Sequence, residues 1–158
     1  VAWLAKDKAH ALGLAKASAE VTHNHPEGIK GAQATALAIY LARQGENNNA
    51  IRQAITDFAD YDLSETVDEI REWYYFNESC AKTVPQAIIC TLEATDFEGA
   101  IRNAISIGGD SDTVAAITGS IAEAMFGIPD EIRKKSRSYL TDEILHVLER
   151  FNKHVKLG

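Results

Sequence analysis

The sequence predicts an all-α protein, and two observations lead to that prediction. Apolar residues recur at three- and four-residue steps along most of the 158-residue chain, and alternating strand patterns are missing. Glycines, prolines and polar runs separate these periodic segments at the intervals typical of short helices joined by short loops. Because 46% of the residues are hydrophobic, we expect one compact multi-helix orthogonal bundle, of about seven or eight helices, with a core of its own.

Three helices are predicted in the first half of the chain. The first spans residues 31–44 and ends at Gly45, and the polar run 46–49 that follows is a loop with a cap at its end. A second helix comes directly after this loop, and a third begins after Ser64. Their apolar faces are formed by Ala34, Leu37, Ala38, Leu41 and Ala42, by Ile51, Ala54, Ile55 and Phe58, and by Val67, Ile70, Trp73 and Tyr74.

The second half continues the helical pattern. Pro85 suits the first turn of a helix, and Asp96 is the expected cap of the next one. A helix follows Thr113, residues 127–129 form a turn, and residues 140–151 form the last helix. The buried faces expected here are Ile88, Ile89 and Leu92, then Phe97, Ala100, Ile101, Ala104 and Ile105, and finally Ile144, Leu145, Leu148 and Phe151.

Composition excludes several classes of protein. A formal net charge of -7 argues against binding to nucleic acid, which requires a basic face. No apolar run is long enough to span a membrane, and residues 1–8 do not resemble a signal peptide, so we expect a cytoplasmic protein. Cys80 and Cys90 form no metal-binding or redox motif and are expected to be reduced and packed. Because the chain starts at Val1 rather than Met, it suggests a segment of a longer protein or a processed product.

A polar cluster at Gly108–Thr113 has the chemistry of a site for a hard cation. The two glycines favour the left-handed conformation that ends one helix, which leaves the oxygens of Asp110, Ser111, Asp112 and Thr113 in the turn that begins the next. Mg²⁺ prefers such oxygen ligands, although this turn would supply only part of its coordination shell. The alternative is that Asp110 or Ser111 only caps the helix, with Asp112 as a favourable charge near its positive end.

A second polar cluster, Thr22–Gly28, precedes the helix expected at residue 31. His23 and His25 flank one residue and point in different directions in an extended segment, so we expect one of them, rather than both, to reach a ligand. The alternative is that both only cap helices or bond the backbone. The other histidines are expected to be solvated: His10, His146 and His154.

Together the two clusters resemble those of the ADP-ribosylglycohydrolases, the relatives of the dinitrogenase reductase-activating glycohydrolase. The likeness is carried by residues 21–28 with 31–38 and by residues 104–119, and it extends through Gly127 along most of the chain. It implies an all-α hydrolase with two Mg²⁺ ions, or Mn²⁺ in some members. Such enzymes cleave the N- or O-glycosidic bond that joins ADP-ribose to a protein side chain or a small acceptor.

The resemblance also assigns residues. It implies that Asp110, Asp112 and Thr113 are metal ligands, with Asp112 best placed to bridge the ions, and that His23 lies beside the bound ADP-ribose. A metal pair that orients ribose hydroxyls and a water is consistent with cleavage through an oxocarbenium-like transition state. A ligand that touches both metal and histidine requires the two loops to lie close together.

The sequence departs from the family pattern in one respect. Family members also carry, in their first half, a Thr-Asp-Asp-Thr cluster with further metal ligands and a glutamate proposed to act on the water or leaving group. This chain has no Thr-Asp-Asp, and Asp57, Asp60 and Asp62 are scattered through a helix and its end. We therefore expect residues 1–158 to be the C-terminal portion of a family member. The catalytic residue stays unknown, and Glu27 is not nominated for this role.

Two functional hypotheses remain. In the first, the chain belongs to a Mg-dependent hydrolase whose partners are an ADP-ribosylated protein or an ADP-ribose-type small molecule and the missing N-terminal portion, and it is inactive alone. In the second, it is a non-catalytic helical module of the same fold, crystallin-like or nucleotide-binding. A Thr-Asp-Asp encoded upstream of Val1 would favour the enzyme.

Overall fold

The computed structural model describes residues 1–155, and this part of the chain is helical without strands, as the sequence predicts. The helices are η1 (Ala2–Leu4), α1 (Lys8–Ala19), α2 (Pro26–Arg43), α3 (Asn48–Ala59), α4 (Val67–Trp73), α5 (Cys80–Leu92), α6 (Phe97–Ser106), α7 (Ser111–Phe126), α8 (Asp130–Arg137) and α9 (Asp142–Val155). They divide into an N-terminal unit, Val1–Gly127, and a C-terminal unit that begins at Ile128.

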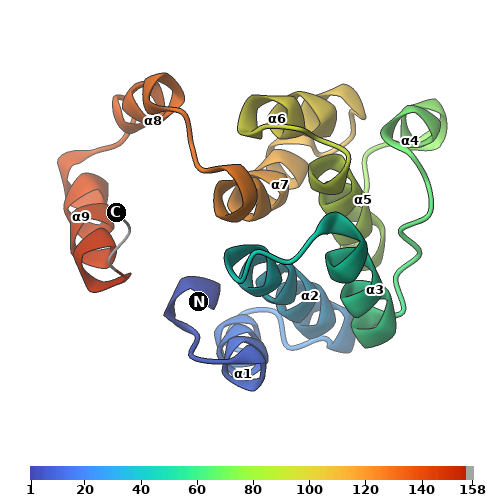
Figure 1. Cartoon of the computed structure of the whole chain (residues 1–158), viewed down its shortest axis with the longest axis horizontal. Helices are drawn as coiled ribbons and strands as arrows, with labels where there is room; N and C mark the ends of the chain where they lie inside the picture. The colour runs from blue at the N-terminus through green and yellow to red at the C-terminus, as the bar shows by residue number, and fades with distance from the viewer. Residues whose placement is uncertain (156–158) are drawn as a thin grey trace. The chain divides into compact units, whose positions relative to one another are not determined.

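Helix α5 forms the centre of the N-terminal unit (Figure 1). It packs against α2, α4, α6 and α7, and every residue from Thr83 to Leu92 is buried. Helix α2 adds a second buried face, from Ala34 to Ala42. It packs against α5 and also against α1 and α3. The apolar burial along these two helices explains why the unit folds around them.

Local signals in the sequence fix several helix starts. The Asp96 carboxylate accepts the backbone N–H of Gly99 at 2.7 Å, which confirms the predicted cap of α6. Asn47 caps α3 in the same way, through the N–H of Ala50. Gly45 takes a φ of 79° directly after the end of α2, as expected for a residue that follows a helix.

The structure corrects several of the sequence-based expectations. Pro85 is not in the first turn of its helix but is the sixth residue of α5, which begins at Cys80 after the N-cap Ser79. Helix α2 starts at Pro26 rather than at residue 31. Proline suits the first position of a helix, because its fixed φ angle is helical and an N–H there would have no partner within the helix. Ile105 was expected in the core, but it is 57% exposed. The last helix was expected at residues 140–151 and runs from Asp142 to Val155.

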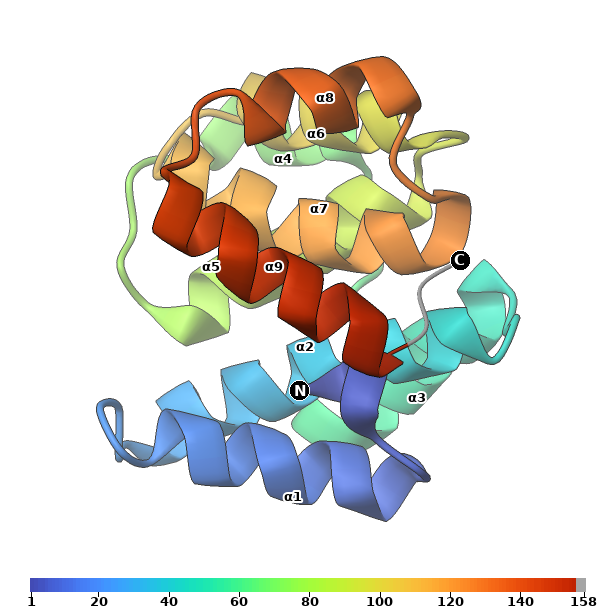
Figure 2. The ribbon, with the colours of Figure 1, turned by 90° about the vertical axis from the view of Figure 1, so that its left-hand side faces the viewer.

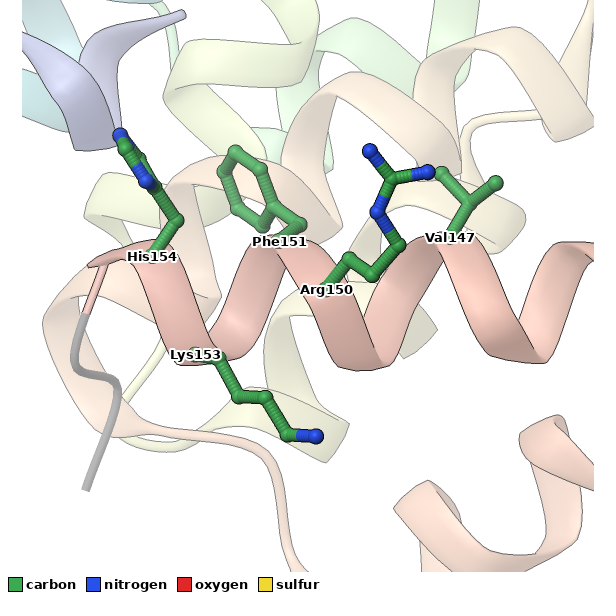
Figure 3. Close-up of a pocket in the computed structure, with 5 residues that line it drawn as sticks. All are labelled: Val147, Arg150, Phe151, Lys153 and His154. Carbon is green, nitrogen blue, oxygen red and sulfur yellow. The ribbon is translucent and has the colours of Figure 1, made fainter.

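Helices α8 and α9 of the C-terminal unit contain no fully buried residue. Ile144 was expected to face inward, but it is 48% exposed, and Leu145, Leu148 and Phe151 are half-buried. Four side chains, Val147, Arg150, Phe151 and His154, share one face of α9 beside a shallow hollow, and Lys153 points away from them (Figure 3). Because no carboxylate lines this hollow, it does not resemble a cation site.

Two further features bear on function. None of the helices in residues 1–155 is both long and apolar enough to cross a bilayer. Helices α2, α5 and α7 all begin on the same side of the N-terminal unit, on the left in Figure 2. Helix N-termini carry a partial positive charge and free N–H groups, so this side of the unit favours negatively charged groups.

Candidate functional site

The Gly108–Thr113 turn has the geometry that the sequence predicts. Gly108 and Gly109 take φ angles of 77° and 67°, and α7 begins two residues later at Ser111. Asp110 occupies the N-cap position, but its side chain makes no capping hydrogen bond to the helix. Asp110 therefore does not act as a side-chain cap, whereas Asp112 does lie in the first turn of α7, where a negative charge is favourable.

The two aspartates of this turn interact with each other. A hydrogen bond from the Asp110 side chain, followed by the backbone N–H groups of Asp112 and Thr113, lowers the pKa of Asp112 below its ordinary value. Both Asp112 and Thr113 are exposed, so their oxygens are accessible.

An aromatic loop that the sequence analysis did not select as part of the site lies against this turn. The loop joins α4 to α5, and a Cβ added at Gly109 would lie 2.5 Å from Tyr74 Cε1 and 3.2 Å from the carbonyl oxygen of Tyr75. Thr83 of α5 holds the loop, because its hydroxyl donates to the Asn77 carbonyl at 3.0 Å. The run of aromatic residues after α4 was the available signal in the sequence.

Two aromatic side chains of this loop face solvent. Tyr75 is 65% exposed and Phe76 is 59% exposed, whereas Tyr74 is buried. Both exposed rings are therefore accessible from solvent.

His23 is exposed at the turn between α1 and α2. Its backbone N–H donates to the Ala19 carbonyl at 2.7 Å, and its own carbonyl accepts the N–H of His25 at 2.8 Å. Its ring nitrogen Nδ1 lies 2.8 Å from the Thr22 hydroxyl. Within residues 1–155, the Nε2 atom of His23 has no hydrogen-bond partner, so it is available to a ligand.

His25 has a different role. It is the N-cap of α2, and its Nδ1 accepts the backbone N–H of Glu27 at 3.2 Å. The capping alternative therefore holds for His25 but not for His23. The expectation that one of the two histidines reaches a ligand stays a prediction.

The start of α5 connects the two candidate loops. On one side, a Cβ added at Gly31 of α2 would lie 3.1 Å from Cys80 Cβ and 3.2 Å from Val84 Cγ2. On the other side, α5 is continuous with the aromatic loop that packs on Gly109. In the described residues no hydrogen bond joins His23 to Asp110, Asp112 or Thr113. The close approach of the two loops therefore stays a prediction.

Polar side chains lie near the contact between α2 and the start of α5. Burial, and next the nearby Glu27 carboxylate and Cys80 thiol, raise the pKa of Tyr61 to about 12. Lys30 lies 2.8 Å from a Glu27 oxygen and stacks over the Tyr61 ring. Both cysteines are free, as predicted, and Cys90 is fully buried while Cys80 is only partly so.

A complete metal site is not formed by residues 1–155 alone. In this part of the chain no three His, Cys, Asp or Glu side chains come together in a group able to hold an ion. Asp110, Asp112 and the Thr113 hydroxyl are oxygen donors of the kind that Mg²⁺ and Mn²⁺ bind, so they fit one side of such a site.

Comparison with known sequences identifies the family. The sequence model of the ADP-ribosylglycohydrolase family matches residues 1–156. The chain belongs to the ADP-ribosylglycohydrolase family. This assignment agrees with the all-α fold and with the resemblance carried by the two polar clusters.

The curated ADP-ribosylglycohydrolase relatives are about twice as long as this chain. ADP-ribosylhydrolase ARH3 of Homo sapiens is 26% identical over 180 residues, an alignment that covers 84% of this chain and 50% of that protein. ARH3 of Gallus gallus is 28% identical over 72% of this chain and 43% of its own length. An uncharacterized protein of Archaeoglobus fulgidus is 29% identical over 90% of this chain and 52% of its own. The chain thus spans about half the length of these relatives.

Proposed function

We propose that this chain is the C-terminal portion of a Mg-dependent hydrolase that removes ADP-ribose from a modified side chain or a small acceptor. The observation that carries the proposal is the turn before α7. There Asp110 stands at a cap position without capping, and Asp112 and Thr113 follow within the first turn of the helix. Two carboxylates and a hydroxyl in one turn are oxygen donors of the kind that Mg²⁺ binds, which supports a cation site here.

The residues of this turn would supply one side of the metal centre. Asp110, Asp112 and Thr113 would hold the ions. When bound, the metal pair supplies Lewis-acid activation of a water and orients the ribose hydroxyls. Two Mg²⁺ ions require about twelve coordination positions, far more than these three side chains offer. The missing N-terminal portion is therefore proposed to provide the other protein ligands and the catalytic glutamate.

The same side of the unit suits the rest of the ligand. ADP-ribose carries two phosphates and a flat adenine ring. The N-termini of α2, α5 and α7 lie on this side and favour anions (Figure 2). Tyr75 and Phe76 offer exposed aromatic faces beside the aspartate turn, and His23 offers a free Nε2. These features support an ADP-ribose-type ligand. They do not specify the acceptor to which the ADP-ribose is joined.

A non-catalytic nucleotide-binding or crystallin-like module is the second candidate. It is favoured by the finding that fewer than three candidate metal-binding side chains cluster anywhere in residues 1–155. The two candidates differ in what an added N-terminal portion would do: the hydrolase gains metal affinity and turnover, and the module gains neither.

The proposal is tested by calorimetric titration of Mg²⁺ or Mn²⁺ into the chain, with and without a separately produced N-terminal portion of a family member. We expect weak binding and no release of ADP-ribose by residues 1–158 alone, and stronger binding with turnover once the portion is added. In that complex Asp112→Ala should weaken metal binding by about tenfold or more, because it removes a charged ligand. Ser111→Ala should leave metal binding nearly unchanged.

Asp60→Asn is the matched control for the loss of one exposed negative charge. Asp60 has a φ of 56° at the end of α3, a conformation that asparagine also tolerates. If Asp112→Ala and Asp60→Asn weakened metal binding equally, the cause would be the loss of one negative charge from the surface and not the loss of a metal ligand. Metal-dependent turnover by residues 1–158 alone, abolished by Asp112→Ala, would contradict the need for a second portion.

A further inference from the structure

Several contacts fix the backbone and the ring of His23, although the residue is exposed at a turn. Its backbone is fixed at both ends, through the bond from its N–H to Ala19 and the bond from His25 to its carbonyl. A third constraint acts on the ring itself, where the Thr22 hydroxyl lies 2.8 Å from Nδ1. An exposed ring gains nothing in hydrophobic burial from such fixing, so the arrangement points to a role in presenting the ring.

The first turn of α2 adds a fourth constraint on the same residue. A Cβ added at Gly28 would lie 3.1 Å from the His23 carbonyl oxygen and 3.5 Å from His23 Cβ. Glycine at this helical position therefore allows the histidine backbone to rest directly on the helix. A larger residue there would require the His23 backbone to shift by a few tenths of an ångström.

We propose that Thr22 is a positioning residue that donates its hydroxyl proton to Nδ1 of His23, so that neutral His23 carries its own proton on Nε2. Within residues 1–155 the Thr22 hydroxyl has no other acceptor, and the Nε2 atom has no partner. The bond made by one ring nitrogen decides which nitrogen is protonated. His23 thus presents a fixed N–H donor to an acceptor oxygen of the ligand, such as a phosphate or ribose oxygen. Only this last step depends on the proposed function.

The neighbouring His25 provides an internal control. Its Nδ1 also accepts a hydrogen bond, but from the backbone N–H of Glu27. His25 should therefore also be protonated on Nε2, independently of any side chain at position 22. Changes that appear at His23 and not at His25 report the Thr22 hydroxyl rather than a general rearrangement of the turn.

The experiment is nitrogen-15 magnetic resonance of the histidine rings in the full 158-residue chain without ligand. It is recorded about two pH units above the ordinary histidine pKa of about 6.5, with His23→Gln to assign the signals. We expect a hydrogen-bonded, unprotonated Nδ1 and a single χ1 rotamer for His23. Thr22→Val should move the Nδ1 resonance toward that of free histidine and average the rotamer, and Thr22→Ser should restore both.

Gly28→Ala tests the backbone contact independently. It should shift the His23 signals, whereas Gly13→Ala, at a helical position with nothing within 4 Å, should leave them unchanged. Both variants add the same methyl group to a helix, so their difference isolates the contact with His23. A protonated Nδ1 in the parent chain, or Thr22→Val spectra identical to those of the parent, would overturn the role of Thr22.

A titration with ADP-ribose, followed at the same resonances, separates this inference from the proposed function. Thr22→Val should weaken ADP-ribose binding by about two- to tenfold, the usual effect of one hydrogen bond, and Thr22→Ser should not. If ADP-ribose perturbs none of the histidine signals even in the presence of Mg²⁺ and the N-terminal portion, while the Thr22-dependent ring state is present, the positioning role stands and an ADP-ribose ligand for His23 is refuted.

Discussion

At the scale of single residues, Gly108 and Gly109 shape the aspartate turn but for different reasons. Both have positive φ angles, which favour glycine because an L side chain there costs about 1–2 kcal/mol. Only Gly109 also lies against a buried aromatic ring, that of Tyr74, whereas a Cβ at Gly108 would meet nothing within 4 Å. The second glycine is therefore needed for packing as well as for backbone conformation.

We expect Gly109→Ala to lower the free energy of unfolding by about 2–4 kcal/mol, since it combines backbone strain with overpacking against Tyr74. Gly108→Ala carries the strain alone and should cost only about 1–2 kcal/mol. Urea denaturation of the two variants measures the difference. Equal losses would mean that the contact between the aromatic loop and the turn contributes nothing to stability.

At the scale of helices, Asp7, Asp96 and Asp110 occupy N-cap positions in the described residues, and Asp110 is the one of the three that makes no capping bond. Asp96 accepts the Gly99 N–H at the start of α6, and Asp110 makes no such bond at the start of α7. Asp110 follows two glycines with positive φ angles and Asp96 does not, so the backbone approaches the two helices differently. At Asp110 the ψ angle is 68°, compared with 172° at Asp96.

Substitution of these two aspartates distinguishes a cap from a ligand. Asp96→Ala should lower the free energy of unfolding by about 1 kcal/mol, the usual contribution of an N-cap. Asp110→Ala, in the presence of a chelator, should change it by less than about 0.5 kcal/mol, because no cap is lost. Thermal or urea unfolding provides the measurement. A loss at Asp110 as large as that at Asp96 would restore the capping interpretation.

At the scale of the whole molecule, the candidate site and the buried core both belong to the N-terminal unit. All the buried apolar side chains of residues 1–155 lie between Ala2 and Ala122, and His23 and the aspartate turn fall in the same range. Helices α8 and α9 add no buried residue. The N-terminal unit therefore has what a stable fold requires.

We expect a fragment of residues 1–127 to fold on its own and to unfold cooperatively, because its core is retained. Its affinity for Mg²⁺ should equal that of the full chain, whether measured alone or with the N-terminal portion of a family member. Circular dichroism, urea unfolding and calorimetry test these expectations. A fragment that lacks a cooperative transition would show that residues after Gly127 contribute to the core.

The sequence alone determined the features that depend on neighbours along the chain. Apolar periodicity predicted the all-α fold, Asp96 marked its helix start, and the Gly108-Gly109 pair marked the turn that gathers Asp110 and Asp112. These signals are readable because caps and turns depend on the conformations of a few consecutive residues. The two polar clusters, taken in order, also indicated the family to which the chain belongs.

Tertiary structure decided what depends on residues far apart in sequence. Periodicity placed Ile105 on the apolar stripe of α6. The packing of α6 against its neighbours determines which part of that stripe is covered, and Ile105 is left exposed. The contact between Tyr74 and Gly109 joins segments that local patterns treat separately. The different contacts of His23 and His25 likewise depend on where α2 begins, since that start makes the His25 ring a cap, whereas the His23 ring lies beside the Thr22 hydroxyl.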